Sequence, residues 1–415
     1  MSEKPNGLTA YIAVTAAYWA FMLTDGALRM LVLLHFHMLG FSPVQLAYLF
    51  VLYEFAGMVT NLCAGWIASR FGLATTLYAG LVMQIVALLA LTQLDVAWGV
   101  TASVMFAMGV QGVSGIAKDL TKMSAKSAVK LLAPDESTTL FKWVAVLTGS
   151  KNAVKGAGFL LGAALLAVWG FYASVLGMAI VLSVVLVAIL IGMPPGLPGG
   201  VKGAKFNEVF STSSKVNWLS FARVFLFGAR DVWFVVGIPV YFYAVLSDGS
   251  EAGNRMAFFT IGSFMAIWTI LYGAVQASTP MVVKVAGTSA HDFALKTRNW
   301  VALLVGIPLV LAMAVLTIEG SSLTVALFAG LLVFGAVFAV NSALHSYMIL
   351  ALSSGDRVTM DVGFYYMANA TGRLLGTMLS GAAYQLGGLA ACLLTAAVML
   401  ALSWLGARQL RREFV

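Results

Sequence analysis

The chain has 415 residues, of which 61% are hydrophobic and only 10% are charged, with a formal net charge of +8. Soluble domains average about 45–50% apolar and about 25% charged residues, so this composition excludes a soluble globular protein. Apolar stretches of about 20 residues recur along the chain, which is the length a helix needs to cross a bilayer. We therefore predict an all-α membrane protein with several transmembrane helices.

Twelve transmembrane helices are expected. In chain order they span 11–38, 43–68, 73–93, 98–118, 139–168, 171–193, 217–246, 257–276, 300–318, 323–350, 358–386 and 388–407. The stretch between the sixth and the seventh is rich in Pro, Gly and Ser, which is typical of a linker. The expected organisation is an N-terminal six-helix bundle (1–193), a cytoplasmic linker (194–216) and a C-terminal six-helix bundle (217–415).

The basic residues predict the orientation of these helices. Of the 24 Lys and Arg residues, only Arg255 falls in a loop on the side reached by the odd-numbered helices. By the positive-inside rule, both termini and the linker are expected in the cytoplasm. The prediction is a multi-pass protein of the inner (plasma) membrane that contacts the lipid bilayer and binds no nucleic acid.

The two halves share a glycine pattern. Gly158-Phe-Leu-Leu-Gly162 in the fifth helix matches Gly372-Arg-Leu-Leu-Gly376 in the eleventh. The segment Gly65–Gly72, "GWIASRFG", resembles the loop signature of the major facilitator superfamily, with Ser69 where an acidic residue is usual. A six-plus-six repeat with this signature resembles that superfamily, which implies a substrate site near the midplane between the halves.

Several charges are predicted to lie well inside the helices. The bases are Arg29, Lys151, Lys155, Arg223, Arg230 and Arg373, and the acids are Asp25, Glu54 and Asp231. A charge at the bilayer centre costs about 2.5–3.5 kcal/mol, so six bases facing lipid would cost about 15–20 kcal/mol. We expect them to face an internal, partly wet cavity with a formal surplus of positive charge.

Spacing suggests how some of these charges are neutralised. Asp25 and Arg29 are four residues apart on one helical face, so they form either a structural pair or a pair that a substrate anion or a proton opens. Lys151 and Lys155 also share a face, with no acid three or four residues away. One lysine losing its proton, an acid such as Glu54 from another helix, or a bound anion would relieve their repulsion.

These charges predict an anion-binding site between the halves. The expected substrate-binding residues are Arg29, Lys151, Lys155, Arg230 and Arg373, with hydrogen bonds from Asn369, Tyr365 and Tyr366. The candidates for proton coupling are Asp25, Glu54 and Asp231. A ridge of lysines on a helical extension of the fourth helix is either a lipid contact or a basic funnel for the substrate. The ridge comprises Lys118, Lys122, Lys126 and Lys130.

Other motifs point away from an enzyme. The chain has no GxSxG, HExxH or Walker sequence, so neither catalysis nor ATP-driven transport is expected, and no cofactor is implied. Cys63 and Cys392 lie in apolar segments and are expected to be packing residues. His35 and His37 project about 200° apart on a helix, so a shared metal ion is not expected.

Three stretches resemble the ArsJ-type organoarsenical efflux permeases, namely Tyr18–Leu73, Gly115–Asp135 and Leu147–Gly162, with a weaker likeness over His345–Gly376. The resemblance implies export of 1-arseno-3-phosphoglycerate, an ester that glyceraldehyde-3-phosphate dehydrogenase makes from arsenate. The ester hydrolyses readily outside the cell, so its export amounts to arsenate resistance. The resemblance further implies a functional link to the dehydrogenase and a monomeric transporter, but it assigns no role to individual residues.

Three alternative functions and one alternative for the driving force stay open. A sugar-phosphate, organophosphate or phosphate exchanger fits the basic site equally well. A broad drug/proton antiporter would need net acidic charge in the cavity, and a membrane receptor would not need basic residues at midplane. A uniporter driven by breakdown of the exported ester would need no proton.

Overall fold

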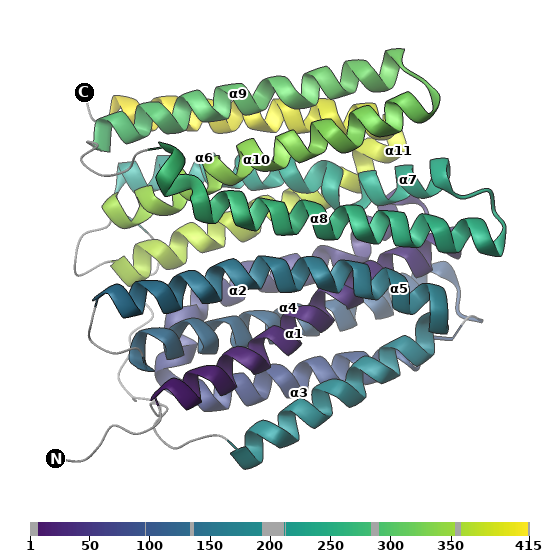
Figure 1. The fold of residues 1–415 in the computed structure, drawn as a ribbon, viewed down its shortest axis with the longest axis horizontal. Coiled ribbons are helices and arrows are strands. Elements are labelled where there is room, and N and C mark those ends of the chain that lie inside the picture. Colours follow the sequence, from purple (N-terminus) through teal and green to yellow (C-terminus); the bar gives the residue numbers. More distant parts are fainter. Residues whose placement is uncertain are drawn as a thin grey trace.

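The structure is a computed structural model that describes residues 7–95, 97–132, 137–192, 211, 213–283, 290–352 and 358–413. These residues form long helices joined by short connections (Figure 1). The elements are α1 (Gly7–Met38), α2 (Pro43–Phe71), α3 (Leu73–Leu91), α4 (Val100–Leu132), α5 (Ser137–Gly192), α6 (Ser214–Val232), the π-helix η1 (Trp233–Gly237), α7 (Ile238–Leu246), α8 (Glu251–Val283), α9 (Ala290–Thr317), α10 (Gly320–Leu352) and α11 (Val358–Arg412).

The two longest helices are each broken by glycine. In α5, Gly170 has a φ of 71° and a ψ of −174°, which is not helical, and in α11 both Gly387 and Gly388 depart from helical geometry. Gly170 and Gly388 adopt positive φ, a conformation that side chains with a Cβ disfavour. The sequence predicted a helix boundary at both places. Each long helix therefore consists of two segments that meet at a sharp bend.

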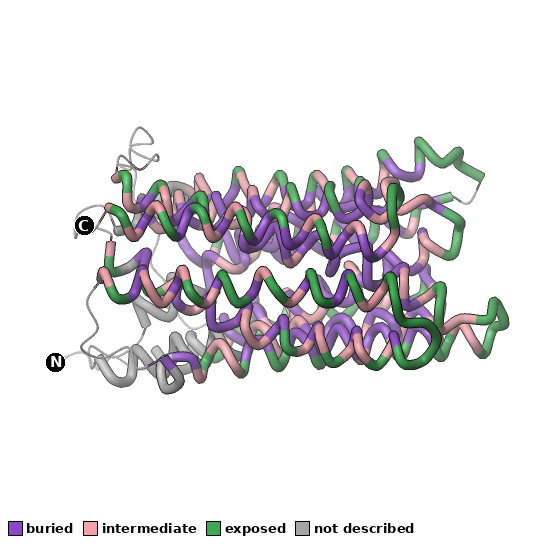
Figure 2. The backbone as a smooth tube through the Cα atoms, turned by 90° about the horizontal axis from the view of Figure 1, so that it is seen from above, coloured by how far each residue is buried: buried purple, intermediate pink, exposed green. Residues whose placement is uncertain are grey.

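The helices suit a bilayer. In the described residues, ten helical segments are long and apolar enough to span a membrane, and one of them, Ser214–Leu246, combines α6, η1 and α7. Figure 2 shows exposed positions along the outer surfaces of the helices and buried positions toward the middle of the molecule. Many exposed side chains are large and apolar, including Ile191 and Leu386, which would be unfavourable in water and favourable in lipid. The protein is a multi-pass helical membrane protein.

The helices fall into two groups in space. In Figure 1, α1–α5 occupy the lower part of the molecule and α6–α11 the upper part, and the start of α1 and the end of α11 lie at the same end. Across the boundary between these groups, α2 packs against α11 and α5 packs against α8. Within the groups, α1 packs against α5 and α6 packs against α11.

The repeated glycines allow two of these close contacts. A Cβ on Gly158 or Gly162 would collide with the backbone of α1 around Leu23 and Ala27. Likewise, a Cβ on Gly372 or Gly376 would collide with the backbone of α6 around Val224 and Gly228. Small residues let helix backbones approach closely in lipid, where there is no hydrophobic driving force between helices. The glycine pattern seen in the sequence thus serves equivalent contacts in the two groups.

Two details of the helices bear on the sequence predictions. The segment Gly65–Gly72 was expected in a loop, but α2 continues through Phe71, and Gly72, with a φ of 78°, separates α2 from α3. The side chains of Ser69 and Arg70 lie outside the described residues, as does most of the expected linker. Cys63 and Cys392 are free thiols within helices; Cys392 is buried, whereas Cys63 is partly buried.

Candidate functional site

A buried carboxylate joins the two groups of helices near the middle of the molecule. Glu54 of α2 accepts hydrogen bonds from two arginines through the same oxygen, Oε1. Arg29 Nη1 of α1 lies 2.8 Å away and Arg373 Nη2 of α11 lies 2.6 Å away. Since α11 belongs to the other group of helices, this carboxylate holds an ion pair across the boundary.

A second carboxylate extends the network into the C-terminal group. Asp231 at the end of α6 lies 3.3 Å from Arg373 Nε. Its other oxygen accepts a hydrogen bond of 2.6 Å from Nε of the adjacent Arg230. Three arginines from α1, α6 and α11 therefore converge on two carboxylates, which leaves a formal surplus of one positive charge. We refer to Arg29, Glu54, Arg230, Asp231 and Arg373 as the arginine network.

The cations and the anions of the network are not equally accessible. The side chains of Arg29, Arg230 and Arg373 are 11%, 15% and 19% exposed. Those of Glu54 and Asp231 are each 1% exposed. The accessible part of the network thus consists of guanidinium groups, whereas both carboxylates are buried. Nη2 of Arg29 is buried and has no hydrogen-bond partner in the part of the chain that the structure describes. An incoming group would therefore meet positive charge first.

A neighbouring pair lies within the N-terminal group. Asp25 of α1 accepts a hydrogen bond of 2.6 Å from the hydroxyl of Tyr53 and lies 3.2 Å from Nζ of Lys155 on α5. The predicted pairing of Asp25 with Arg29 is therefore wrong, because each finds a partner on another helix. The repulsion expected between Lys151 and Lys155 is relieved at Lys155 by Asp25 rather than by Glu54. Lys151 is half-buried.

Aromatic rings cover the network on the side away from the start of α1 and the end of α11. Phe50, Phe159 and Phe234 each lie four residues, about one helical turn, from a charged residue of the site, namely Glu54, Lys155 and Arg230. Their rings contact cations: Arg29 lies 4.9 Å from the Phe50 centroid, Lys155 5.9 Å from that of Phe159, and Arg230 5.8 Å from that of Phe234.

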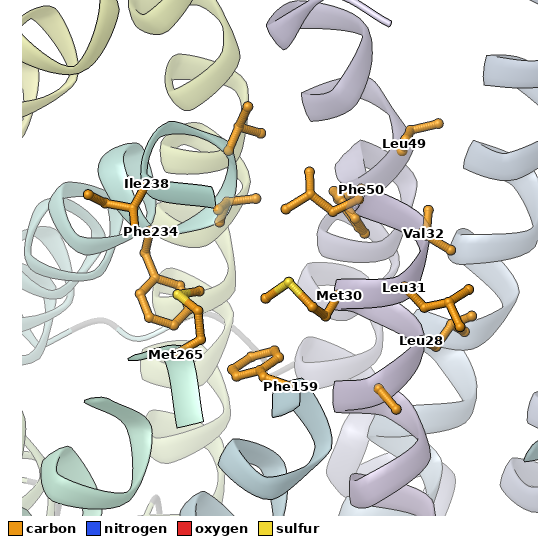
Figure 3. Close-up of a cluster of buried hydrophobic side chains, with 14 of the residues drawn as sticks. Leu28, Met30, Leu31, Val32, Leu49, Phe50, Phe159, Phe234, Ile238 and Met265 are labelled. Atoms are coloured by element: carbon orange, nitrogen blue, oxygen red, sulfur yellow. The ribbon is translucent and has the colours of Figure 1, made fainter. Parts of the chain in front are cut away.

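These rings belong to a buried apolar cluster. Figure 3 shows Phe159 and Met30 between the side chains of the N-terminal group and those of the C-terminal group, which include Phe234 and Met265. The Phe159 and Phe234 centroids are 6.0 Å apart across the boundary. Farther along the same direction, Gly381 of α11 approaches the backbone of Pro43 too closely to accept a Cβ. An apolar layer therefore closes the site at this end.

A second charged cluster lies on the opposite side of the network, around Asp119. This fully buried aspartate of α4 accepts hydrogen bonds from Lys122, Thr60 and Asn61, and Nζ of Lys118 lies 3.7 Å away. Lys122 Nζ also donates to Asn61, and it lies 5.8 Å from the ring of Tyr366 on α11. Sequence reasoning missed Asp119, since the predicted helix ended at Lys118, one residue before it.

The first two lysines of the ridge, Lys118 and Lys122, are therefore not surrounded by solvent. Lys118 is buried, with Nζ 4.2 Å from the Tyr53 ring centroid, and the side chain of Lys122 is 21% exposed. Both face Asp119, because helix α4 continues through Leu132 and packs this face against α2. At these two residues the structure shows a buried ion-pair cluster around Asp119 rather than a lipid contact, and the basic funnel stays a prediction. The side chains of Lys126 and Lys130 lie outside the described residues.

The expected hydrogen-bonding residues on α11 serve another arginine. Asn369 accepts a hydrogen bond of 2.9 Å from Nε of Arg223, and the Tyr365 ring lies 5.0 Å from the same guanidinium. Tyr366 points toward Lys122, as described above. Arg223 was recognised as a base inside a helix but not as part of the expected site. The structure thus brings Arg29, Arg230 and Arg373 together and places Asn369 and Tyr365 in a separate cluster.

Metal-ligating side chains do not gather in the described residues. No group of three or more His, Cys, Asp or Glu side chains in those segments has the proximity to hold a metal ion. His35 stacks on Phe171 with centroids 4.0 Å apart, whereas His37 meets Tyr243 edge-on at 4.9 Å. The two imidazoles therefore face different neighbours.

Comparison with known proteins identifies the fold. The sequence matches no protein-family model and no curated protein. The solved structures that resemble it over nearly the whole chain include three transporters. A POT family transporter in complex with 5-aminolevulinic acid is 14% identical, with a TM-score of 0.68, and the match covers 97% of this chain and 95% of that one.

The other two structures give similar values. A point mutant of the nucleoside transporter NupG is 16% identical with a TM-score of 0.70, covering 98% of this chain and 100% of that one. A bacterial homologue of the iron transporter ferroportin in an inward-facing state is 13% identical with a TM-score of 0.70, covering 97% and 99%. At these identities the likeness establishes the fold, which is that of helical membrane transporters, and not the substrate.

Proposed function

We propose that the protein is a secondary transporter of the major facilitator type that exports a small organic anion. The observation that carries the proposal is the arginine network, whose three guanidinium groups are partly accessible and whose carboxylates are buried. Guanidinium groups bind phosphate, arsenate and carboxylate through paired hydrogen bonds. A transporter of hydrophobic cations would need the opposite arrangement, with accessible carboxylates.

In this proposal the molecule is two six-helix bundles, residues 1–193 and 217–415, joined by a cytoplasmic linker. The bends at Gly170 and Gly388 divide α5 and α11 into two crossings each, which supports the count of twelve. An even number of crossings agrees with the location of the start of α1 and the end of α11 at one end of the molecule. Together with the distribution of basic residues, this favours a cytoplasmic location for both termini and residence in the inner membrane.

Substrate binding would act on the cross-boundary ion pair. An anionic group that approaches Arg29 and Arg373 competes with Glu54 for the same donors, and one that approaches Arg230 competes with Asp231. Removing one partner of a buried ion pair costs about 3–5 kcal/mol unless another charge replaces it. A substrate anion supplies that replacement, so binding would release Glu54 from Arg373 without leaving either arginine unpaired.

Release of this ion pair would permit the two bundles to rock. A ligand shifts a conformational equilibrium only by its difference in affinity for the two states. Here the difference arises because the anion replaces a contact that joins α2 to α11. Protonation of Glu54, Asp231 or Asp25 would weaken the same ion pairs, and these three carboxylates are the proposed places of proton coupling. Opening also requires the apolar layer around Phe159 and Phe234 to separate.

Among organic anions we propose 1-arseno-3-phosphoglycerate as the substrate and arsenate resistance as the result. The proposal rests on the resemblance of the N-terminal half to ArsJ-type permeases and on the agreement between a multiply anionic ester and a cluster of arginines. It includes a functional link to glyceraldehyde-3-phosphate dehydrogenase, which makes the ester. Lys155, which pairs with Asp25 beside the network, and Lys151, one helical turn before it on α5, are proposed to add positive charge to the site.

The arginine network also fits a second class of substrate. Phosphate esters present the same tetrahedral oxyanion, so an organophosphate or phosphate exchanger is the second candidate function.

The test is arsenic retention in arsenate-sensitive cells that express the chain with and without additional glyceraldehyde-3-phosphate dehydrogenase. Lower retention that needs both proteins would support the proposal, and the matched variant Arg373→Gln should abolish it. Unchanged retention with the protein present in the membrane would contradict the arsenylated substrate and favour the organophosphate exchanger. The variant Lys155→Ala, if it left transport intact, would argue against a role for the fifth helix in the site.

A further inference from the structure

Arg223 is a buried cation without a carboxylate partner in the described residues. It lies on α6 and is 4% exposed. The described residues that contact its guanidinium are neutral: Asn369 Oδ1 accepts from Nε at 2.9 Å, and the carbonyl and hydroxyl oxygens of Ser342 accept from Nη1 at 3.3 and 3.4 Å. Its Nη2 donates no hydrogen bond to any described residue. A guanidinium carries five N–H donors, so several remain for another acceptor.

The surroundings of Arg223 are polar and reach the boundary between the two groups of helices. Ser342 Oγ is contacted at 3.1 Å by the hydroxyl of Tyr272 and at 3.3 Å by Nε2 of Gln276. Asn152 of α5, in the other group, donates to Gln276 at 3.4 Å. The cluster thus extends from α6 through α10 and α8 to α5. Asn152, Gln276 and Asn369 are half-buried, so the amides of this cluster are more accessible than Arg223 itself.

A second buried group in this region lacks a partner. His345 lies on α10 one turn beyond Ser342 and is fully buried. Neither of its ring nitrogens has a hydrogen-bond partner in the described part of the chain. Buried polar groups in proteins are rarely left unsatisfied, and exceptions often mark a functional site. An unsatisfied imidazole and an arginine without a counter-charge in one polar cluster point to a ligand that supplies acceptors and negative charge.

Arg223 is also linked in space to the arginine network. It lies seven residues, two helical turns, before Arg230, so the two side chains share a face of α6. Both contact the ring of Phe227, at 3.9 Å for Arg223 and 5.1 Å for Arg230. These two contacts limit the separation of the guanidinium carbons to about 9 Å. A small dianion is long enough to contact both guanidinium groups.

We infer that Arg223 is a second anion-binding position of the transport site, and that the substrate is an organic anion with a charged group at each of its two ends. This inference rests on the proposed function and makes it more specific. One end binds the arginine network in place of Glu54 or Asp231. The other end takes the donors of Arg223 that Asn369 and Ser342 now occupy or leave unused. A monoanion would satisfy only the first position, so the second position selects for length and charge.

The experiment compares one-headed and two-headed phosphonates on the full chain in lipid nanodiscs. Propylphosphonate and propane-1,3-diphosphonate differ by the second anionic group, and their affinities are measured by titration calorimetry. We expect the wild type to bind the diphosphonate at least about tenfold more tightly, since a second charge-assisted contact forms. The variant Arg223→Gln should lose that preference and keep its affinity for propylphosphonate within about threefold, which also shows that it is folded.

Two further variants separate the effect of charge from that of guanidinium geometry and provide a control. Arg223→Lys keeps the charge without the planar fork and should retain part of the preference. Arg255→Gln, which removes an exposed arginine at the beginning of α8, should behave as wild type. A preference for the diphosphonate that persists in Arg223→Gln would overturn the inference, as would equal affinities for the two ligands in the wild type.

Failure of the inference is distinguishable from failure of the proposed function. Wild-type protein that binds propylphosphonate but shows no preference for the diphosphonate retains the anion site and loses only the second position. Wild-type protein that binds neither ligand overturns both. An Arg223-dependent preference together with unchanged arsenic retention in cells supports the second position and rejects the arsenylated ester as the substrate.

Discussion

Glu54→Gln is the substitution that most directly examines the role of the cross-boundary ion pair. Glutamine has nearly the same shape as glutamate, so it keeps an oxygen between Arg29 and Arg373 but removes the charge. Hydrogen bonds to charged groups contribute about 1.5–3 kcal/mol and neutral ones about 0.5–1.5 kcal/mol. With two such bonds, at 2.8 and 2.6 Å, the substitution removes about 2–3 kcal/mol.

In the proposed mechanism the same free energy opposes anion binding in the wild type, because the anion displaces the carboxylate. The affinity of Glu54→Gln for a phosphonate is therefore expected to rise by about 30- to 150-fold, while the variant unfolds at a lower temperature. Transport should slow, since release of a tightly held anion limits turnover. Glu319→Gln, at an exposed position between α9 and α10, is the matched control and should change neither quantity.

Titration calorimetry in nanodiscs gives the affinity, and thermal unfolding of the purified chain gives the stability. An affinity for propylphosphonate that is equal to or lower than that of the wild type would refute the idea that Glu54 and the substrate compete for the same arginines. A lower unfolding temperature without tighter binding would assign Glu54 a purely structural role.

Three further substitutions test other parts of the structure. Asp25→Asn leaves Lys155 without its charge partner and should lower the free energy of unfolding by about 3–5 kcal/mol, and adding Lys155→Met should restore most of it. Thermal unfolding of the single and double variants measures both effects, and an additive loss would contradict the pairing. Gly162→Leu should abolish folded protein in the membrane, because a Cβ at this position collides with α1. Gly177→Leu is the control, since a Cβ there meets open space and the variant should express normally. Equal yields of the two variants in fluorescence-detected size exclusion would argue against the close helix contact. Ser380→Ala removes the acceptor for the backbone N–H groups of the π-helix and should cost about 1–3 kcal/mol of stability, and an unchanged unfolding temperature would show that this contact is dispensable.

The helical architecture was readable from the sequence because lipid leaves few options. A long apolar stretch in a bilayer has to be helical. Glycine readily adopts the positive φ that ends a helix, and the bends at Gly170 and Gly388 lie where the sequence predicted helix boundaries. The glycine pattern shared by Gly158 and Gly372 indicated a repeat, and in the structure both glycines allow close helix contacts, with α1 and α6 respectively. The π-helix was missed, although Pro239, which lacks a backbone N–H, was a signal for altered hydrogen bonding in that stretch.

The sequence predicted which residues belong to the site better than it predicted which of them form ion pairs. Burial of charge required the inward orientation of Arg29, Arg230 and Arg373, and the structure places them together. Spacing along one helix wrongly paired Asp25 with Arg29, because ion partners in a bundle come from neighbouring helices that a linear pattern does not reveal. For the same reason the sequence pattern did not reveal that Lys118 and Lys122 both pair with a buried acid, Asp119.

The most direct measurement of the central claim uses inside-out membrane vesicles that contain the protein. Glyceraldehyde-3-phosphate dehydrogenase, carbon-labelled glyceraldehyde-3-phosphate, the oxidised nicotinamide cofactor and labelled arsenate are supplied outside, where the cytoplasmic face is exposed. The proposed function predicts that arsenic and carbon labels enter the vesicles in equal amounts and only when the dehydrogenase is active. Arsenic uptake without the dehydrogenase, or no uptake of either label by vesicles that contain the folded protein, would contradict it.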